Sequence, residues 1–247
     1  MNDSKMIHPS SLVYDKYGNE KGLPLIILED FLLRNSKTSL SLESNYFREF
    51  CIYHVKYLRW ENFPLNEKSL IEDMVEKLEE ILFSLERKPL LISQGYSSAL
   101  AMKIAQDHPE KIRSLHLFSP VIFLSNDIDQ AENYKDFFLW WTSGEDPIKN
   151  FFALPSLADF FWKYLNLIDI CSKQEYKVEL NFWLGEKHSI KDSLHLQERF
   201  PGLEVLRMDK VSHREMIHDP KVQKIMAWNF KKYLNTVRNN QETGKKK

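Results

Sequence analysis

Residues 90–121 read LLISQGYSSALAMKIAQDHPEKIRSLHLFSPV, and this stretch decides the fold. An apolar run that ends at Ile92 leads into a turn, and the small and apolar residues that follow predict a helix over 98–107. Pro109 marks the end of that helix, because proline cannot continue it. Residues 112–118 then form a second apolar run. A strand, a helix and a strand in this order predict a βαβ unit with two parallel strands.

Short apolar runs alternate with longer amphipathic segments through the rest of the chain, which is typical of a mostly parallel sheet covered by helices. The segment 70–85 has its apolar residues at three-and-four spacing, as a helix requires. The run at 24–28 is apolar throughout, as expected for a strand buried on both faces. The expected strands are 12–17, 24–28, 51–58, 89–92, 112–118, 178–184 and 203–208, and the expected helices are 70–85, 98–107 and 220–234.

An insertion rich in aromatic residues separates the strands expected at 112–118 and 178–184. It is too long for a plain crossover, so we predict a helical cap over 122–176. Some of its rings are neighbours in sequence, and adjacent residues on a helix point in different directions. Most rings are expected to pack the cap onto the sheet, and the surplus to face a pocket, a partner or a second copy of the chain. The doublets are Phe137-Phe138, Trp140-Trp141 and Phe160-Phe161.

The composition excludes several classes of protein. The chain has 247 residues, of which 34 are basic and 35 acidic, and this balance gives no electrostatic argument for binding nucleic acid or an anionic membrane. Cys51 and Cys171 cannot form a disulfide framework and lack metal-ligand spacing, so each is expected to be a small buried residue. No signal peptide and no bilayer-spanning stretch is evident. We expect a soluble cytoplasmic protein, and nothing in the sequence calls for a cofactor.

Three motifs in sequence order resemble the α/β-hydrolase superfamily over nearly the whole chain. In the first, at 90–121, a tight turn reading ISQGYSS precedes a helix of small residues and a turn reading HPEKI. The second, WLGEK at 183–187, resembles the strand and turn that carry the catalytic acid. The third, from VSH at 211–213 to HDP at 218–220, resembles the loop of the catalytic histidine. The resemblance implies a three-layer α/β/α fold with a mostly parallel central sheet, a core at 1–121 and 177–240, an inserted helical cap at 122–176 and a flexible tail at 241–247.

The site residues depart from this resemblance at three independent positions. The family's nucleophile elbow has the pattern G-x-S-x-G, and its alignment here puts Gly95 at the apex, where a nucleophile side chain is required. His188 takes the position of the acid. The loop that usually reads His-Gly and binds the oxyanion reads Glu29-Asp30, and two carboxylates there would repel a developing oxyanion. Only His213 stands where the family has its catalytic histidine.

Two substitutes for the missing chemistry remain open. Ser93 and Ser97 occupy the flanking glycine positions, and either becomes a displaced nucleophile if His213 reaches its hydroxyl. The opposing interpretation buries Ser93 at the strand end and lets Ser97 satisfy free backbone donors of the helix. His213 and His188 could instead hold a metal ion together with a carboxylate from residues 29–30. None of these residues has local ligand spacing, and a lone loop histidine is more often simply hydrogen-bonded.

The function we predict is that of a catalytically degenerate α/β-hydrolase-like protein, which binds a small apolar ligand or a protein partner in the former active-site cleft. The alternative is an active esterase, thioesterase or lyase-type enzyme that uses His213 with a displaced serine or as a general base. A structural or complex-forming subunit with no ligand is a third class, and a homodimer is among the expected partners. The pocket is expected at the carboxyl ends of the parallel strands, around the vestigial triad positions Gly95 and His188. Its predicted residues are Glu29, Asp30, Gln94, Tyr96, Trp140, Trp141 and Phe161.

Overall fold

The computed structural model gives the arrangement of the core elements. The residues it describes are 12–29, 42, 44–57, 70–120, 163, 166–167, 170–171, 173–186, 190–211 and 216–244. Most of the predicted cap and all of its aromatic doublets lie outside these residues, so the cap stays a prediction.

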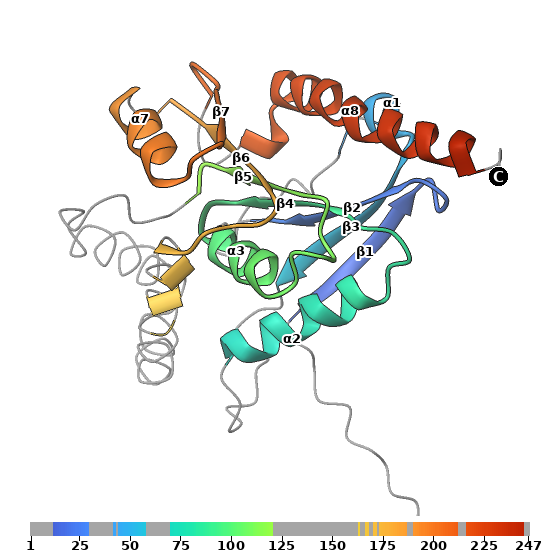
Figure 1. Ribbon diagram of the computed structural model, residues 1–247, viewed down its shortest axis with the longest axis horizontal. Helices are drawn as coiled ribbons and strands as arrows, with labels where there is room; N and C mark the ends of the chain where they lie inside the picture. Colours follow the sequence, from blue (N-terminus) through green and yellow to red (C-terminus); the bar gives the residue numbers. More distant parts are fainter. Residues whose placement is uncertain are drawn as a thin grey trace, which may run out of the picture.

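The described residues form a seven-stranded sheet with the strand order β1-β3-β2-β4-β5-β6-β7 (Figure 1). β1 runs antiparallel to β3, and every other neighbouring pair is parallel. The predicted mostly parallel sheet is therefore confirmed. The strands are β1 (Leu12–Gly18), β2 (Leu23–Leu28), β3 (Phe50–Tyr57), β4 (Leu90–Gln94), β5 (Ser114–Phe118), β6 (Glu179–Leu184) and β7 (Glu204–Arg207).

Helices cover both faces of this sheet, which makes the three layers of an α/β/α fold. Figure 1 shows α2 and α3 on one face and α1 and α8 on the other. Two short 3-10 helices, η2 and η3, lie beside the strand ends. The bounds are α1 (Ser44–Phe47), α2 (Leu70–Phe83), η2 (Gly95–Ser97), α3 (Ser98–Asp107), α7 (Ile190–Arg199), η3 (Met216–His218) and α8 (Pro220–Gly244).

Alternate residues of the central strands supply the two cores. Ile26 and Leu91 pack into the cluster under α2 and α3. Leu25 and Leu90 belong to the cluster under α1 and α8. Successive side chains of a strand point to opposite faces, so a strand covered on both sides is apolar throughout. All six residues of β2 are accordingly buried.

The last helix is longer than the sequence predicted. α8 starts where the Asp219 carboxylate accepts hydrogen bonds from the backbone N–H groups of Lys221 (2.7 Å) and Val222 (3.3 Å), as an N-cap does. It continues to Gly244 instead of ending at residue 234, because neither proline nor glycine interrupts 221–243. Its end therefore reaches into the range 241–247 assigned to a tail.

Two helices were not predicted, for different reasons. α1 is a single turn, and α7 (IKDSLHLQER) has only three apolar residues, so it does not stand out as an apolar segment. None of the helices in the described ranges has the apolar length needed to cross a membrane.

Candidate functional site

The sharp turn between β4 and α3 is the centre of the candidate site. Gln94, the last residue of β4, is extended, with φ −125° and ψ 142°. Gly95 follows with φ 57°, in the left-handed region that glycine adopts without a steric penalty. The chain then enters η2 and continues directly into α3. This is the strand-to-helix turn that the sequence predicted, with no side chain at its apex.

The two serines beside the apex are both fully buried. The Ser93 hydroxyl donates to Ser98 Oγ over 3.3 Å, and the Ser97 hydroxyl donates to the backbone carbonyl of Glu29. The prediction that Ser93 is buried at the strand end is therefore confirmed. The prediction that Ser97 caps the helix is wrong, because Ser97 makes no side-chain capping bond to α3. The hydroxyl instead satisfies the backbone carbonyl of the residue that follows β2 and ties that residue to the apex turn.

Glu29 lies between two histidines that the sequence did not single out. Its Oε1 atom is 2.9 Å from Nε2 of His54 and 3.9 Å from Nε2 of His218. His54 belongs to β3, where it pairs with Ile27, and it is almost completely buried. Neither Glu29 Oε1 nor His54 Nε2 has an aligned hydrogen bond to the residues that the structure describes, so the 2.9 Å approach is a close contact of two polar groups. The Glu29 side chain is 23% exposed.

A buried glutamine holds the loop that follows the position of the catalytic histidine. Gln94 Oε1 accepts a hydrogen bond from the backbone N–H of Ile217 (3.1 Å), and Gln223 Nε2 donates one to the carbonyl of Ile217 (3.0 Å). Both glutamines are only 2% exposed. Ser119, at the end of β5, points its hydroxyl at the sulfur of Met216 over 3.8 Å. η3 is therefore fixed to the carboxyl ends of β4 and β5.

The chain segments that enter the acid and histidine loops lie side by side. The backbone N–H of Glu186 donates to the carbonyl of Val211 (3.0 Å), and that of Met208 donates to Leu184 (2.8 Å). Tyr96 is half-buried and packs against the core under α2 and α3. The other predicted site residues, Asp30, Trp140, Trp141, Phe161, His188 and His213, lie outside the described residues.

Another histidine near the sheet centre is unsuited to replace the catalytic base. His116, on β5, is 1% exposed, and burial lowers its pKa to about 3. Its ring is 4.7 Å from that of Phe230, and it accepts a hydrogen bond from Trp183 Nε1 (3.4 Å). Ser114 Oγ lies 2.9 Å from its other ring nitrogen. His116 is therefore a neutral packing residue at physiological pH.

Solved hydrolase structures share the fold of this chain. The protein MGS-MChE2, an α/β hydrolase enzyme from the metagenome of sediments of the Mar Chica lagoon in Morocco, matches with a TM-score of 0.64 and 15% identity over 92% of this chain and 97% of its own. The monoacylglycerol lipase of Paleococcus ferrophilus matches with a TM-score of 0.63 and 13% identity over 90% of this chain and 98% of its own. A marine microorganism esterase gives 0.62 and 19%, over 90% and 100%. The chain has the α/β-hydrolase fold.

No family model and no curated protein matches the sequence. The structural similarity establishes the α/β-hydrolase fold. Because the identities are below 20%, the chemistry has to be argued from the residues of this chain. In this fold, ligands bind outside the carboxyl ends of the parallel strands. Glu29, Gly95 and Gly185 each follow directly on such a strand end.

Proposed function

We propose that this chain is a hydrolase-fold protein without serine-nucleophile chemistry, which binds a small apolar ligand at the carboxyl edge of its sheet. The observation that carries the proposal is Gly95, with a φ of 57° at the apex of the strand-to-helix turn. An α/β-hydrolase presents its nucleophile from that residue. A glycine there offers no reacting group.

The neighbouring serines support the same conclusion. A nucleophile needs a hydroxyl that a base can deprotonate and a substrate can reach. Ser93 and Ser97 are fully buried, and their hydroxyls donate to Ser98 and to the carbonyl of Glu29. To attack a substrate, either serine would have to leave its hydrogen bond and the core.

The chemistry at the end of β2 supports it as well. An acyl-transfer site needs hydrogen-bond donors aimed at the developing oxyanion. Here the residue after β2 is Glu29, whose carboxylate lies against His54 and His218. A carboxylate in this position disfavours an oxyanion. We therefore expect the ligand to be bound here without being hydrolysed. A protein segment that binds at the same edge of the sheet is the competing occupant.

Hydrolysis of a panel of aryl esters tests the loss of serine chemistry. The wild-type protein, His213→Ala and Gly95→Ser are compared, and we expect all three to be inactive. Gly95→Ser restores the hydroxyl but neither the acid nor the oxyanion donors. Turnover by the wild type that His213→Ala abolishes would refute the proposal and make Ser93 or Ser97 the nucleophile to map.

Thermal melting in the presence of fatty acyl and aromatic small molecules tests ligand binding. A ligand that binds only the folded state raises the melting temperature by mass action. Gly95→Ala adds a methyl group at the apex and should reduce that increase. Gly202→Ala is the matched control, because Gly202 also has a positive φ (83°) and no atom lies within 4 Å of its added Cβ. No shift with any compound, or equal shifts in both variants, would favour a protein occupant or a structural role.

The contacts of Glu29 favour one alternative, an enzyme in which this carboxylate serves as a general base. Glu29 Oε1 lies 2.9 Å from His54 Nε2 and 3.9 Å from His218 Nε2, and a carboxylate is a side chain that can act as a general base. Turnover on the same ester panel would then survive His213→Ala and be lost in Glu29→Gln. Glu20→Gln, an exposed position in the turn after β1, serves as control.

A further inference from the structure

The outward surface of α8 combines exposed lysines with an exposed tryptophan. The α8 outer face comprises Lys221, Lys224, Ile225, Trp228 and Lys231, which recur at spacings of three and four along one side of the helix. The Trp228 side chain is 70% exposed, more than any other large apolar side chain in the described part of the chain. Ile225, one turn before it, is 37% exposed.

The core does not require these residues. The opposite side of α8 packs onto the sheet through Val222, Met226 and Phe230, all fully buried. Trp228 lies between two of these positions in sequence and therefore points away from them on a helix of 3.6 residues per turn. An indole left in water on the far side of its helix is available for a contact outside the molecule.

Charge is segregated onto this helix. Residues 220–244 contain five basic residues and one acidic residue, Glu242, so the remainder of the chain, which is −1 in total, carries a net charge of −5. Lys232, at the border of the face, is already paired with Glu179 (2.6 Å). Within the described ranges, no carboxylate pairs with the three lysines of the α8 outer face.

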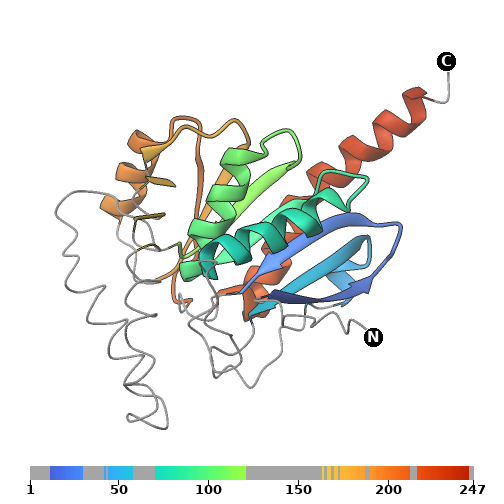
Figure 2. The same cartoon turned by 90° about the horizontal axis from the view of Figure 1, so that it is seen from below.

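We propose that the α8 outer face docks reversibly on an anionic lipid surface. Tryptophan prefers the boundary between headgroups and acyl chains, and lysine stems lie along apolar surface while their charges stay in water. A basic amphipathic helix suits this location. Figure 2 shows that the C-terminal half of α8 projects beyond the sheet, while the residues of the α8 outer face lie on its first half.

Whole-chain charge balance does not contradict this proposal. At physiological ionic strength charges act over about 8 Å, so a membrane responds to the face that touches it and not to the net charge of the protein. Each lysine near an anionic leaflet strengthens binding about fivefold. Three lysines therefore predict about a hundredfold preference for anionic over neutral vesicles.

Vesicle co-sedimentation of the full-length protein tests the proposal. We expect binding to mixed phosphatidylcholine–phosphatidylserine vesicles that weakens as salt is added, and little binding to phosphatidylcholine alone. Reversing two charges, Lys224→Glu with Lys231→Glu, should weaken binding at least about 25-fold. Trp228→Ser should weaken binding and leave its salt dependence unchanged.

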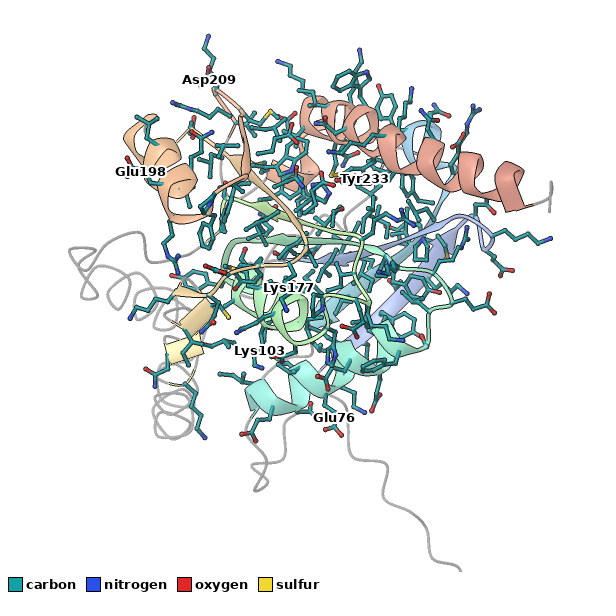
Figure 3. The ribbon with its side chains drawn as sticks, in the orientation of Figure 1. Glu76, Lys103, Lys177, Glu198, Asp209 and Tyr233 are labelled. Atoms are coloured by element: carbon teal, nitrogen blue, oxygen red, sulfur yellow. The ribbon has the colours of Figure 1, made fainter. Side chains whose placement is uncertain are left out.

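The matched control is Lys173→Glu with Lys177→Glu, which changes the net charge equally at exposed positions. Figure 3 shows Lys177 well apart from α8. This control should bind like the wild type, and melting curves verify that all variants are folded. Binding without anionic lipid, equal losses in the two double variants, or no binding to any vesicle overturns the proposal. Binding to polyglutamate but not to vesicles, lost in Lys224→Glu with Lys231→Glu, would instead identify an acidic protein as the partner.

Discussion

Replacing Gln94 by methionine tests how the sheet holds the loop that follows His213. Methionine keeps the length of the side chain and removes its hydrogen-bonding atoms. The backbone N–H of Ile217 then loses its 3.1 Å partner, and because Ile217 is fully buried, water cannot replace it. An orphaned buried donor costs about 1–3 kcal/mol. We therefore expect a loss of about 2 kcal/mol in the free energy of unfolding.

Urea unfolding measures this loss as a lower midpoint at an unchanged slope. Gln197→Met, at an exposed position on α7, is the matched control and should unfold like the wild type. Gln223→Met should also destabilise the protein, because Gln223 holds the carbonyl of Ile217 at 3.0 Å. Both glutamines hydrogen-bond to the backbone of Ile217. The loss of unfolding free energy in the double variant should therefore differ from the sum of the two single losses by at least about 0.5 kcal/mol. A loss below about 0.5 kcal/mol for Gln94→Met would refute the reasoning.

Three further predictions concern buried and paired groups. Burial holds the pKa of His116 at about 3, below its unfolded value of 6.5, so acid protonates the unfolded chain first. Urea unfolding should therefore show a loss of about 2 kcal/mol as the pH falls from about 6.5 to about 4.5, and His116→Gln should lack that component of the pH dependence. Burial raises the pKa of Cys171 to about 11, and Cys51 is buried too, so a maleimide should label both thiols in urea and neither in the folded protein. Glu179→Gln breaks a contact with Lys232 that is nearly half exposed, so melting should reveal a loss of no more than about 1 kcal/mol, and a loss above about 2 kcal/mol would contradict this account.

The sequence predicted the elements that are mostly buried. The run at 24–28 and the helix at 98–107 are both present, the second with the predicted bounds. In both cases, burial demands apolar or small residues at almost every position, and that demand is visible without any knowledge of the neighbours. The positive φ of Gly95 was also predictable, because a chain that passes from strand to helix without a loop needs such a residue.

The polar contacts of the site were not predictable, because the sheet register creates them. Glu29, His54 and His218 are far apart in sequence, and His54 sits in a strand whose other signals are apolar. Ser97 precedes a helix, and its hydroxyl was expected to cap that helix. Its hydroxyl instead serves the carbonyl of Glu29, because that carbonyl lies at the end of β2, where its own strand offers no donor. A single sequence shows that a serine before a helix favours capping it. It does not show that a carbonyl from a distant strand will accept the same hydroxyl.

The apex turn keeps its shape without a nucleophile, because the packing around it depends on that shape. Ser97 can reach the carbonyl of Glu29, and Gln94 can reach Ile217, only if the chain reverses direction at Gly95. A side-chain-bearing residue in this left-handed conformation costs about 1–2 kcal/mol, a strain that functional sites tolerate for their chemistry. Glycine removes that cost and retains the contacts. Gly95→Ser should therefore restore the strain without restoring hydrolysis, since the sequence predicts Glu29 and His188 where the family has its oxyanion donors and its acid.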